Sequence, residues 1–398
     1  MIHDDGLSPI RFELLEAAPT KATTLEPMPE EAPVTTELKP IALPSLPDEP
    51  LVSVLVSNYN YGRFVGHALE SALRQTYERI EVVVCDDGST DESCSVIEEI
   101  AAKDERVSLI RKENGGQGSA FNAAFAKSKG QVVCFLDADD VWLPSKVEKC
   151  VRSLQTTNGG LLVHQMFVVD SDLRELQRIP TFTRFENGWI ADRVLARGGR
   201  WRWMPTSAMA MRREVLTSIL PMPEAPFRTE ADTFILMLAP LMTEVQSIEE
   251  VLGLYRLHGA NAFSARQFDR EAVVRTICAL SDGIDEVNKR LSSSGMSGVQ
   301  LSQDRNIKIA EQKFLRDAFD GRPRGKLARE YGLLARKLRD DDLYSPAQKA
   351  WALVMFGLMI PMPTGVRASW ASVNLGTSRI RDLARRFRQL TFASRKAR

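Results

Sequence analysis

Short apolar runs alternate with amphipathic segments from residue 51 to residue 137. Four runs of five or six residues, rich in β-branched side chains, predict buried strands over Val52–Ser57, Ile80–Cys85, Val107–Arg111 and Val132–Leu136. Between them, apolar side chains at helical spacing predict helices over Arg63–Gln75, Asp91–Lys103 and Ser119–Ser128. Strands that alternate with helices indicate right-handed βαβ units and a parallel sheet, so the sequence predicts an α/β fold.

The pattern becomes less regular after residue 158. It predicts strands over Leu161–Val169, Thr206–Met211 and Ser247–Tyr255, and a helix over Asp232–Leu241. From about Phe263 to Leu338 it is helical and charged, which predicts a mostly helical C-terminal appendage. We therefore expect four parts: an N-terminal segment over residues 1–49, an α/β domain over 50–262, the helical appendage over 263–345, and an apolar, then basic C-terminal segment over 346–398.

The N-terminal segment differs in composition from the rest of the chain. Residues 1–49 contain eight of the twenty prolines, many glutamates and little hydrophobic periodicity. Such a segment cannot bury enough apolar surface to offset the entropy lost on ordering. We therefore predict that it is disordered and that order begins at Leu51.

Charge and composition limit the possible partners and the cellular location of the protein. The chain has 52 basic and 52 acidic residues, which argues against a general nucleic-acid binder. The five cysteines lack metal-site spacing and are typical of buried thiols in a reducing compartment. The first residues show no signal-peptide pattern, and no apolar run reaches the roughly 18 residues of a spanning helix. We expect a cytoplasmic protein.

The C-terminal segment combines an apolar stretch with a basic one. Trp351–Met362 is apolar but only twelve residues long. Arg379–Arg398 is rich in arginine, and Ile380, Leu383, Phe387 and Leu390 stand at helical spacing. A basic amphipathic helix suits the surface of an anionic membrane, which predicts peripheral contact with its inner face. A helix docked on the α/β domain accounts for the same pattern, so both interpretations stay open.

Polar residues follow three of the predicted strands, as Ser57–Asn60, Asp86–Asp87 and Asp137–Asp140. Ligands of open α/β sheets bind outside the carboxyl ends of the strands, so these clusters predict one binding crevice. Asp137 and Asp139 alternate along an extended segment and can face the same ligand. Carboxylate oxygens of this kind hold Mg²⁺ or Mn²⁺ against phosphate groups. The first strand is followed by neither the dinucleotide-binding glycine motif nor a P-loop.

With these motifs in place, Leu51–Leu154 resembles the nucleotide-binding half of family 2 glycosyltransferases, whose fold is called GT-A. The matching stretches are VSVLVSNYNYGRFVGHALESALRQTY, IEVVVCDDGSTDES, NGGQGSAFNAAFAKSKG and VVCFLDADDVW. The span that holds them, Leu51–Leu154, is about a quarter of the chain, and a weaker resemblance continues through His258. The resemblance implies an inverting, metal-dependent, hexosyltransferase-like enzyme. It would move a sugar from a nucleotide sugar, expected to be a UDP-sugar, to a hydroxyl of a glycan, polysaccharide or lipid-linked acceptor.

The resemblance also implies roles for residues at the donor site. Asn58 and Tyr59 would border the base, Asp87 would hold it with Asp86 beside it, and Asp137 would contact the ribose. Asp139 would hold the metal, and Gly118 and Asn122 would lie against the donor, although a plain turn explains the glycine nearly as well. Arg256 is expected at the leaving diphosphate or in a surface salt bridge. His258 is expected as a metal ligand, a phosphate contact or a structural histidine.

The catalytic base and the acceptor contacts are less constrained. Relatives carry a Glu-Asp pair before an apolar helix, and Asp232 matches the aspartate of that pair, which makes it the expected base. In this sequence Ala231 stands where the glutamate is expected, so Glu230 stays an alternative base. Asp232 also fits a helix N-cap. Trp201 and Trp203 are expected either at the acceptor or in ordinary packing. The Ala231 departure also fits a catalytically inactive, nucleotide-sugar-binding scaffold of a glycan assembly complex.

Overall fold

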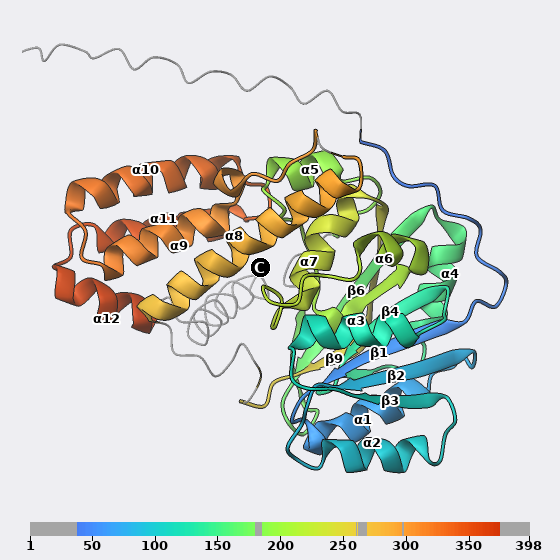
Figure 1. The fold of residues 1–398 in the computed structure, drawn as a ribbon. Coiled ribbons are helices and arrows are strands. Elements are labelled where there is room, and N and C mark those ends of the chain that lie inside the picture. Colours follow the sequence, from blue (N-terminus) through green and yellow to red (C-terminus); the bar gives the residue numbers. More distant parts are fainter. Residues whose placement is uncertain (1–37, 180–184, 260, 262–268, 297, 375–398) are drawn as a thin grey trace, which may run out of the picture. The chain divides into compact units, whose positions relative to one another are not determined.

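The computed structural model describes residues 38–179, 185–259, 261, 269–296 and 298–374. These residues form a nine-stranded sheet in the order β3-β2-β1-β4-β8-β6-β9-β5, and β7 pairs with β6 (Figure 1). The strands are β1 (Val52–Asn58), β2 (Ile80–Asp86), β3 (Val107–Arg111), β4 (Val132–Asp137), β5 (Val141–Trp142), β6 (Gly159–Val169), β7 (Glu175–Ile179), β8 (Met209–Arg212) and β9 (Glu244–Arg256).

Helices follow or connect these strands. In the sheet region they are α1 (Gly62–Leu73), α2 (Ser93–Ala101), α3 (Gln117–Lys127), α4 (Lys146–Thr156), α5 (Ala191–Ala196), α6 (Arg213–Ile219) and α7 (Ala231–Leu238). Beyond the sheet they are α8 (Arg270–Ser293), α9 (Ile307–Phe319), α10 (Arg324–Asp340), α11 (Pro346–Met359) and α12 (Thr364–Asn374).

The first four strands form the parallel half of the sheet, as the sequence predicted. β1 pairs in parallel with β2 and with β4, and β2 pairs in parallel with β3. Successive residues of β1 contribute to different cores, since Leu55 packs with Phe121 of α3 whereas Val54 packs with Val65 of α1. Helices therefore cover both faces, which is why these strands are apolar along their whole length.

The second half of the sheet is mixed, because β8 runs antiparallel to both β4 and β6. The strand predicted over Thr206–Met211 begins only at Met209, after a 3-10 turn over Thr206–Ala208. Polar contacts explain this late start: the Ser207 hydroxyl accepts a hydrogen bond from Asp137 N (3.0 Å), and Ser207 O accepts one from Trp142 Nε1 (2.9 Å). The turn thus joins β8 to the end of β4.

An extended segment over residues 38–50 precedes β1, so the described structure starts earlier than the predicted Leu51. Ile41 N donates to Met242 O (2.8 Å), and Gln155 Nε2 donates to Pro47 O (2.8 Å). Leu38, Ile41, Leu43 and Leu46 pack against the two cores of the sheet. Four apolar side chains give this part of the proline-rich segment enough contact to be placed. Residues 1–37, where disorder was also predicted, lie outside the described residues.

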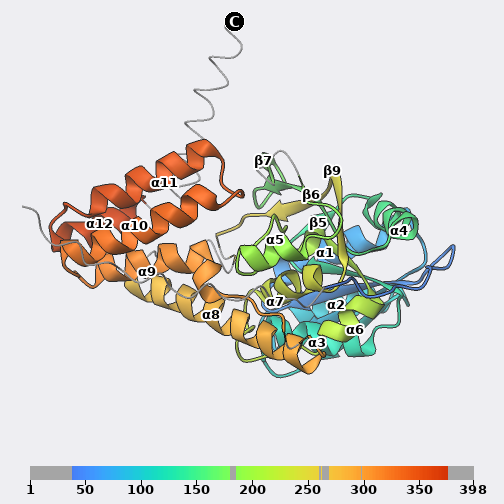
Figure 2. The same cartoon turned by 90° about the horizontal axis from the view of Figure 1, so that it is seen from above.

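The C-terminal helices α9 to α12 pack together (Figure 2). Their separate core includes Phe314 of α9 and Phe356 of α11, whose rings meet edge to face with centroids 5.3 Å apart. α8 also borders the sheet region, where Arg290 Nη2 donates to Pro221 O (2.5 Å). Within the described residues, no helix is long and apolar enough to cross a membrane. The domain boundary predicted at 262 and the basic segment 379–398 fall outside the described residues.

Candidate functional site

The end of β4 carries three carboxylates in four residues, and each has different partners. Asp137 Oδ1 accepts a hydrogen bond from Gln117 Nε2 (3.0 Å). Asp140 is fully buried, and its Oδ1 accepts a hydrogen bond from Arg256 N (2.9 Å). Burial, and then the neighbouring charge of Asp139, raise the pKa values of both Asp137 and Asp140 well above the usual range. The raised pKa values mean that the three carboxylates of this turn resist carrying their negative charges together unless a positive charge lies close by.

Asp139 and His258 meet at this turn although 119 positions separate them in the chain. His258 Nε2 lies 3.0 Å from Asp139 Oδ2, which also accepts a hydrogen bond from Asn261 Nδ2 (3.0 Å). The His258 ring packs against Phe64 with centroids 4.3 Å apart, and its backbone N–H donates to Asn261 Oδ1 (2.8 Å). The structure thus brings together the two residues that the sequence predicted as metal ligands.

This pair fits a metal ion that also binds substrate phosphates. A carboxylate oxygen and an imidazole nitrogen are both suitable ligands for a divalent cation such as Mn²⁺. In the described part of the chain, no group of three or more His, Cys, Asp or Glu side chains is arranged to hold a metal. Mg²⁺ and Mn²⁺ often take only one or two ligands from the protein, with substrate phosphates and water completing the shell.

Arg256 lies behind the same turn. Arg256 is almost fully buried, and its Cζ atom lies 4.9 Å from the centroid of the Phe64 ring. Arg256 Nε donates a hydrogen bond to Asp139 O (2.8 Å). Arg256 Nη1 donates to Ser171 O (3.1 Å). These contacts make Arg256 a support of the backbone at Asp139, and they differ from the exposed salt bridge that was one alternative. A contact with the leaving diphosphate stays a prediction.

Asp86 and Asp87 lie at the end of β2 and are both buried. Asp86 Oδ2 accepts hydrogen bonds from Asn58 Nδ2 (2.7 Å) and Ser89 Oγ (2.6 Å). Burial acts to raise the pKa of Asp86, but the hydrogen bonds from Ser89 and Asn58 outweigh it and lower that pKa. Asn58 is buried as well, whereas the neighbouring Tyr59 is exposed. Tyr59 therefore remains available to border a base.

Asp87 orders the loop that precedes α3. It accepts hydrogen bonds from the backbone N–H groups of Gly115 (2.9 Å) and Gly116 (2.6 Å), and from Lys112 Nζ (2.8 Å). A carboxylate with this many donors is held in one orientation. Its predicted contact with the nucleoside base stays a prediction.

Gln117, the first residue of α3, joins two parts of the site. Its Nε2 donates to Asp137, and its Oε1 accepts a hydrogen bond from Ala231 N (3.0 Å). Ala231 begins α7, so Asp232 lies in the first turn of that helix and is not its N-cap. Asp232 Oδ2 accepts a hydrogen bond from Thr206 Oγ1 (3.3 Å), and burial raises the pKa of Asp232. The candidate base is thus tied to both β4 and the 3-10 turn.

Glu230, the alternative base, occupies the N-cap position of α7 in a left-handed conformation with φ of 62°. Its backbone carbonyl accepts a hydrogen bond from Thr233 N (3.0 Å). Left-handed conformations of residues other than glycine are uncommon and often mark functional sites. The backbone at Glu230 therefore sets the direction in which α7 presents Asp232.

The segment around Gly118 packs tightly against protein. A Cβ atom on Gly118 would lie 2.8 Å from Phe227 O, and one on Gly116 would lie 2.4 Å from Arg228 Cα. The side-chain amide of Asn122 makes two hydrogen bonds with the backbone of Met222. Its Nδ2 donates to Met222 O (2.9 Å), and its Oδ1 accepts a hydrogen bond from Met222 N (2.9 Å). Intramolecular packing thus accounts for Gly118 and Asn122, and their contact with a donor stays a prediction.

The two tryptophans predicted at the acceptor have different surroundings. Trp201 is buried, and its Nε1 donates to Leu236 O (2.6 Å), as expected for the packing alternative. Trp203 is half-buried and lines a cavity of about 150 Å³ together with Arg200, Leu280 and Lys308. Trp203 is therefore the member of the pair with an accessible face.

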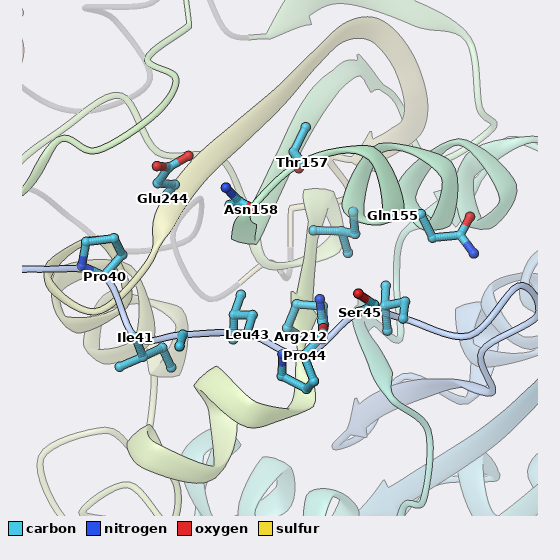
Figure 3. Close-up of a pocket in the computed structure, with 13 residues that line it drawn as sticks. Pro40, Ile41, Leu43, Pro44, Ser45, Gln155, Thr157, Asn158, Arg212 and Glu244 are labelled. Atoms are coloured by element: carbon cyan, nitrogen blue, oxygen red, sulfur yellow. The ribbon is translucent and has the colours of Figure 1, made fainter.

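Figure 3 shows the residues that line a second cavity, of about 390 Å³. Its lining includes residues 40–46, Arg212 and Glu244. Arg212 pairs with Val132 at the start of β4, whereas Asp137 ends that strand. The cavity is therefore near the start of β4, at the opposite end of this strand from the candidate site.

Three supporting residues were not singled out from the sequence: Gln117, Thr206 and Asn261. Each uses its side chain to hold a carboxylate that the sequence did single out. Gln117 and Asn261 stand in polar stretches next to recognised motifs, which is a weak signal. Their partners are 20 to 122 positions away, and only the fold reveals them.

Comparisons with known proteins identify the class. The family model described as Glycosyl transferase family 2 matches residues 53–220. The chain is 33% identical over 308 residues to an uncharacterized glycosyltransferase of Nostoc sp. (strain PCC 7120). This alignment covers 77% of this chain and 93% of that protein. It is 37% identical over 107 residues to the UDP-Glc:alpha-D-GlcNAc-diphosphoundecaprenol beta-1,3-glucosyltransferase of Escherichia coli, covering 27% of this chain and 42% of that enzyme.

Among solved structures, S. aureus TarS in complex with UDP-GlcNAc aligns with a TM-score of 0.48 and 18% identity, over 77% of this chain and 90% of that one. The sequence matches alone define the protein as a glycosyltransferase. Because the alignment spans nearly all of the Nostoc protein, the chain belongs to glycosyltransferase family 2, and its sheet has the GT-A fold.

Proposed function

We propose that this protein is an inverting, metal-dependent glycosyltransferase that transfers a sugar from a UDP-sugar to a hydroxyl group of a glycan, polysaccharide or lipid-linked acceptor. One observation carries the proposal. The Asp139–His258 pair stands at the end of β4, and Gln117 links the adjacent Asp137 to the helix that carries Asp232. This connection between the loops supports the proposal of a donor site and a base that lie close together. The Escherichia coli relative, whose name states a UDP-Glc donor and a lipid-linked acceptor, supports this choice of substrates.

The residues divide the reaction between them. The acceptor oxygen attacks the anomeric carbon of the donor, and the carboxylate of Asp232 takes its proton. The bond from that carbon to the diphosphate oxygen breaks, and the nucleoside diphosphate leaves. Asp139 and His258 would hold a divalent cation, and that cation would supply positive charge to offset the charge of the leaving diphosphate. Arg256 acts through Asp139, because it fixes the carbonyl of that residue.

Other assignments complete the proposal. Tyr59 and Asp87 border the nucleoside base, Asp137 contacts the ribose, and the exposed face of Trp203 receives the acceptor. The basic segment 379–398 contacts the inner face of the membrane from the cytoplasmic side. The roles of Tyr59, Asp87, Asp137 and Trp203 rest on the resemblance to the family and on the placement described above, whereas the role of segment 379–398 rests on its basic amphipathic sequence alone.

Donor hydrolysis tests the proposal without an acceptor, because many transferases slowly hydrolyse their donor. The purified protein is assayed against a panel of UDP- and GDP-sugars with Mg²⁺, Mn²⁺ or EDTA. We expect metal-dependent release of one nucleoside diphosphate and its loss in Asp139→Ala. Asp232→Asn should lower kcat by roughly 10²- to 10⁴-fold, the usual contribution of a general base. Asp192→Asn, which changes an exposed carboxylate on α5, is the matched control.

The alternative function is a nucleotide-sugar-binding scaffold without activity, which the Ala231 departure favours. Calorimetric binding of a donor with no turnover in the presence of any tested acceptor would support the scaffold. If no donor binds at all, both functions are wrong.

A further inference from the structure

α11 is apolar around its whole circumference. No charged residue occurs between Lys349 and Arg367, a stretch that includes most of the helix. One face is buried in the helical core through Ala352, Phe356 and Met359. Helices that are apolar on all sides are normally covered on all sides.

The opposite face of α11 is exposed. Val354 is 59% exposed and Leu358 is 47% exposed, and the half-buried Trp351 precedes them by one turn. Residues at spacings of three and four lie on one side of a helix, so these three side chains form a continuous stripe. We call Trp351, Val354 and Leu358 the α11 outer face. Exposed contiguous apolar surface of this kind marks an interaction site.

The helix next to α11 carries exposed basic residues. α10 lies beside α11, since Tyr331 of α10 donates its hydroxyl hydrogen bond to Leu353 O (3.1 Å) and Lys349 Nζ donates to Arg339 O (2.7 Å) (Figure 1). The exposed side of α10 carries Arg329 and Arg336 at helical spacing around the exposed Leu333. The described residues 321–374 contain nine Lys or Arg and four Asp or Glu, although the whole chain is neutral.

We propose that the α11 outer face, flanked by the basic side of α10, docks on an anionic lipid surface. An apolar stripe bordered by cations matches the two layers of such a surface, acyl chains below and negative headgroups above. The proposal goes beyond the transferase activity and assigns the contact to two described helices. No helix within the described ranges can cross a membrane, so α11 would lie in the plane of the interface.

Vesicle co-sedimentation of the full chain tests this proposal. We compare pure phosphatidylcholine vesicles with vesicles that contain phosphatidylglycerol, at low and high salt. We expect binding to the anionic vesicles that weakens with salt, because exposed charges are screened. Val354→Ser combined with Leu358→Ser should reduce partitioning by at least about tenfold, since two apolar side chains then lose their burial. Both substitutions keep the net charge, so the loss reports the apolar contact alone.

Two further variants make the comparison specific. Leu176→Ser changes a side chain on β7 that is 49% exposed, and it should leave partitioning unchanged. Arg329→Gln combined with Arg336→Gln should weaken binding to anionic vesicles and reduce its salt dependence.

A fluorescence measurement on the native sequence covers the case in which the double serine variant fails to fold. Vesicles of brominated phosphatidylglycerol should quench tryptophan emission, and Trp351→Phe should remove part of that quenching. No sedimentation with anionic vesicles, or equal partitioning of the serine variant and the wild type, would overturn the proposal. Dimerisation that the serine variant abolishes, without vesicle binding, would instead assign the face to a second copy of the chain. Vesicle binding needs no donor, so any of these failures leaves the transferase proposal intact.

Discussion

Asp232 shares one end of the sheet with three other carboxylates, and its surroundings decide how readily it takes a proton. Burial raises its pKa, whereas the hydrogen bond from Thr206 acts to lower it. A base with a raised pKa is better matched to proton transfer near neutral pH than an ordinary aspartate. Thr206 is therefore a tuning partner of the candidate base.

The pH dependence of the reaction should report this tuning. The base must be deprotonated to act, so kcat/KM should fall as pH decreases through the pKa of Asp232. We expect the acid limb above the ordinary aspartate value of about 3.9. Thr206→Val removes a hydrogen bond that favours the charged form, so the limb should move to higher pH, while Thr206→Ser should leave it in place. If the acid limb of kcat/KM lies at the same pH in the valine and serine variants, Thr206 does not tune the pKa of Asp232.

Single residues show where the sequence was sufficient at this scale and where it was not. Asp139 and His258 stood in recognisable motifs, and the structure places their side chains 3.0 Å apart. Asp87 and Asn122 also stood in motifs, but the structure engages both with protein groups that lie 25 to 100 positions away. A motif names a residue type at a position, whereas the partners of that residue depend on the packing of distant loops.

At the scale of elements, the start of α3 connects the separate parts of the site. Asp87 holds the loop before α3, Gln117 reaches β4 and α7, and Gly116 allows residue Arg228 to approach. The first turn of one helix thus fixes the relative positions of the donor loops and the base.

Substitution of Gln117 tests this connection. Gln117→Ala removes hydrogen bonds to Asp137 and to the backbone of Ala231, and a hydrogen bond to a charged group contributes about 1.5–3 kcal/mol. We expect kcat to fall by roughly 10- to 100-fold while the folded fraction at assay temperature is unchanged. Steady-state kinetics beside circular dichroism would check this. Wild-type kcat in the variant would show that Gln117 has no positioning role.

Gly116 tests the same turn through stability. Its φ of +93° and the close approach of Arg228 leave no room for a side chain, so Gly116→Ala should lower the free energy of unfolding by more than about 1 kcal/mol. Gly332→Ala is the matched control, because Gly332 lies within α10 with no atom within 4 Å of an added Cβ. It should stabilise the protein by about 0.5–1 kcal/mol. Urea unfolding measures the free energy of unfolding of both variants. Equal changes in that free energy would contradict the description of the turn at Gly116.

The helices and strands of the first half of the chain were predictable because each one shows its own periodicity of apolar side chains in the sequence. β1 to β4 and α1 to α3 appear within a few residues of their predicted bounds. β5, with two residues, and β7 carry no usable periodicity, and they form because β9 and β6 offer them free edges. The placement of residues 38–50 likewise depends on grooves that exist only in the folded sheet.

At the scale of the whole molecule, ion pairs join the sheet region to the C-terminal helices, and the Arg200–Asp341 pair is buried. Arg200 Nη1 pairs with Asp341 Oδ2 at 2.6 Å, and Arg197 pairs with both Glu186 and Asp342. Asp341 and Asp342 follow α10 directly, so these contacts hold the α10–α11 connection against the segment that leads to Trp203. The sequence predicted a helical appendage but gave no sign of this attachment, because its partners lie about 140 positions apart.

Removing one charge should show how much this attachment contributes. Asp341→Asn leaves Arg200 buried without its partner charge, and loss of a buried partner typically costs about 3–5 kcal/mol. Glu70→Gln, which breaks the exposed pair with Arg74, should cost at most about 0.5 kcal/mol. Thermal unfolding measures both, and a similar small effect in the two variants would mean that the Arg200–Asp341 pair is dispensable.

The most direct test of the account is the coupling between metal and nucleotide at the Asp139–His258 pair. Calorimetry would measure UDP binding with and without Mn²⁺ in the wild type, in Asp139→Asn and in the control Asp192→Asn. We predict that Mn²⁺ tightens UDP binding by about tenfold or more in the wild type and the control, a coupling of at least about 1.4 kcal/mol, and that Asp139→Asn abolishes it. UDP binding that is equally tight with and without Mn²⁺, or a coupling that survives in Asp139→Asn, would contradict the proposed site.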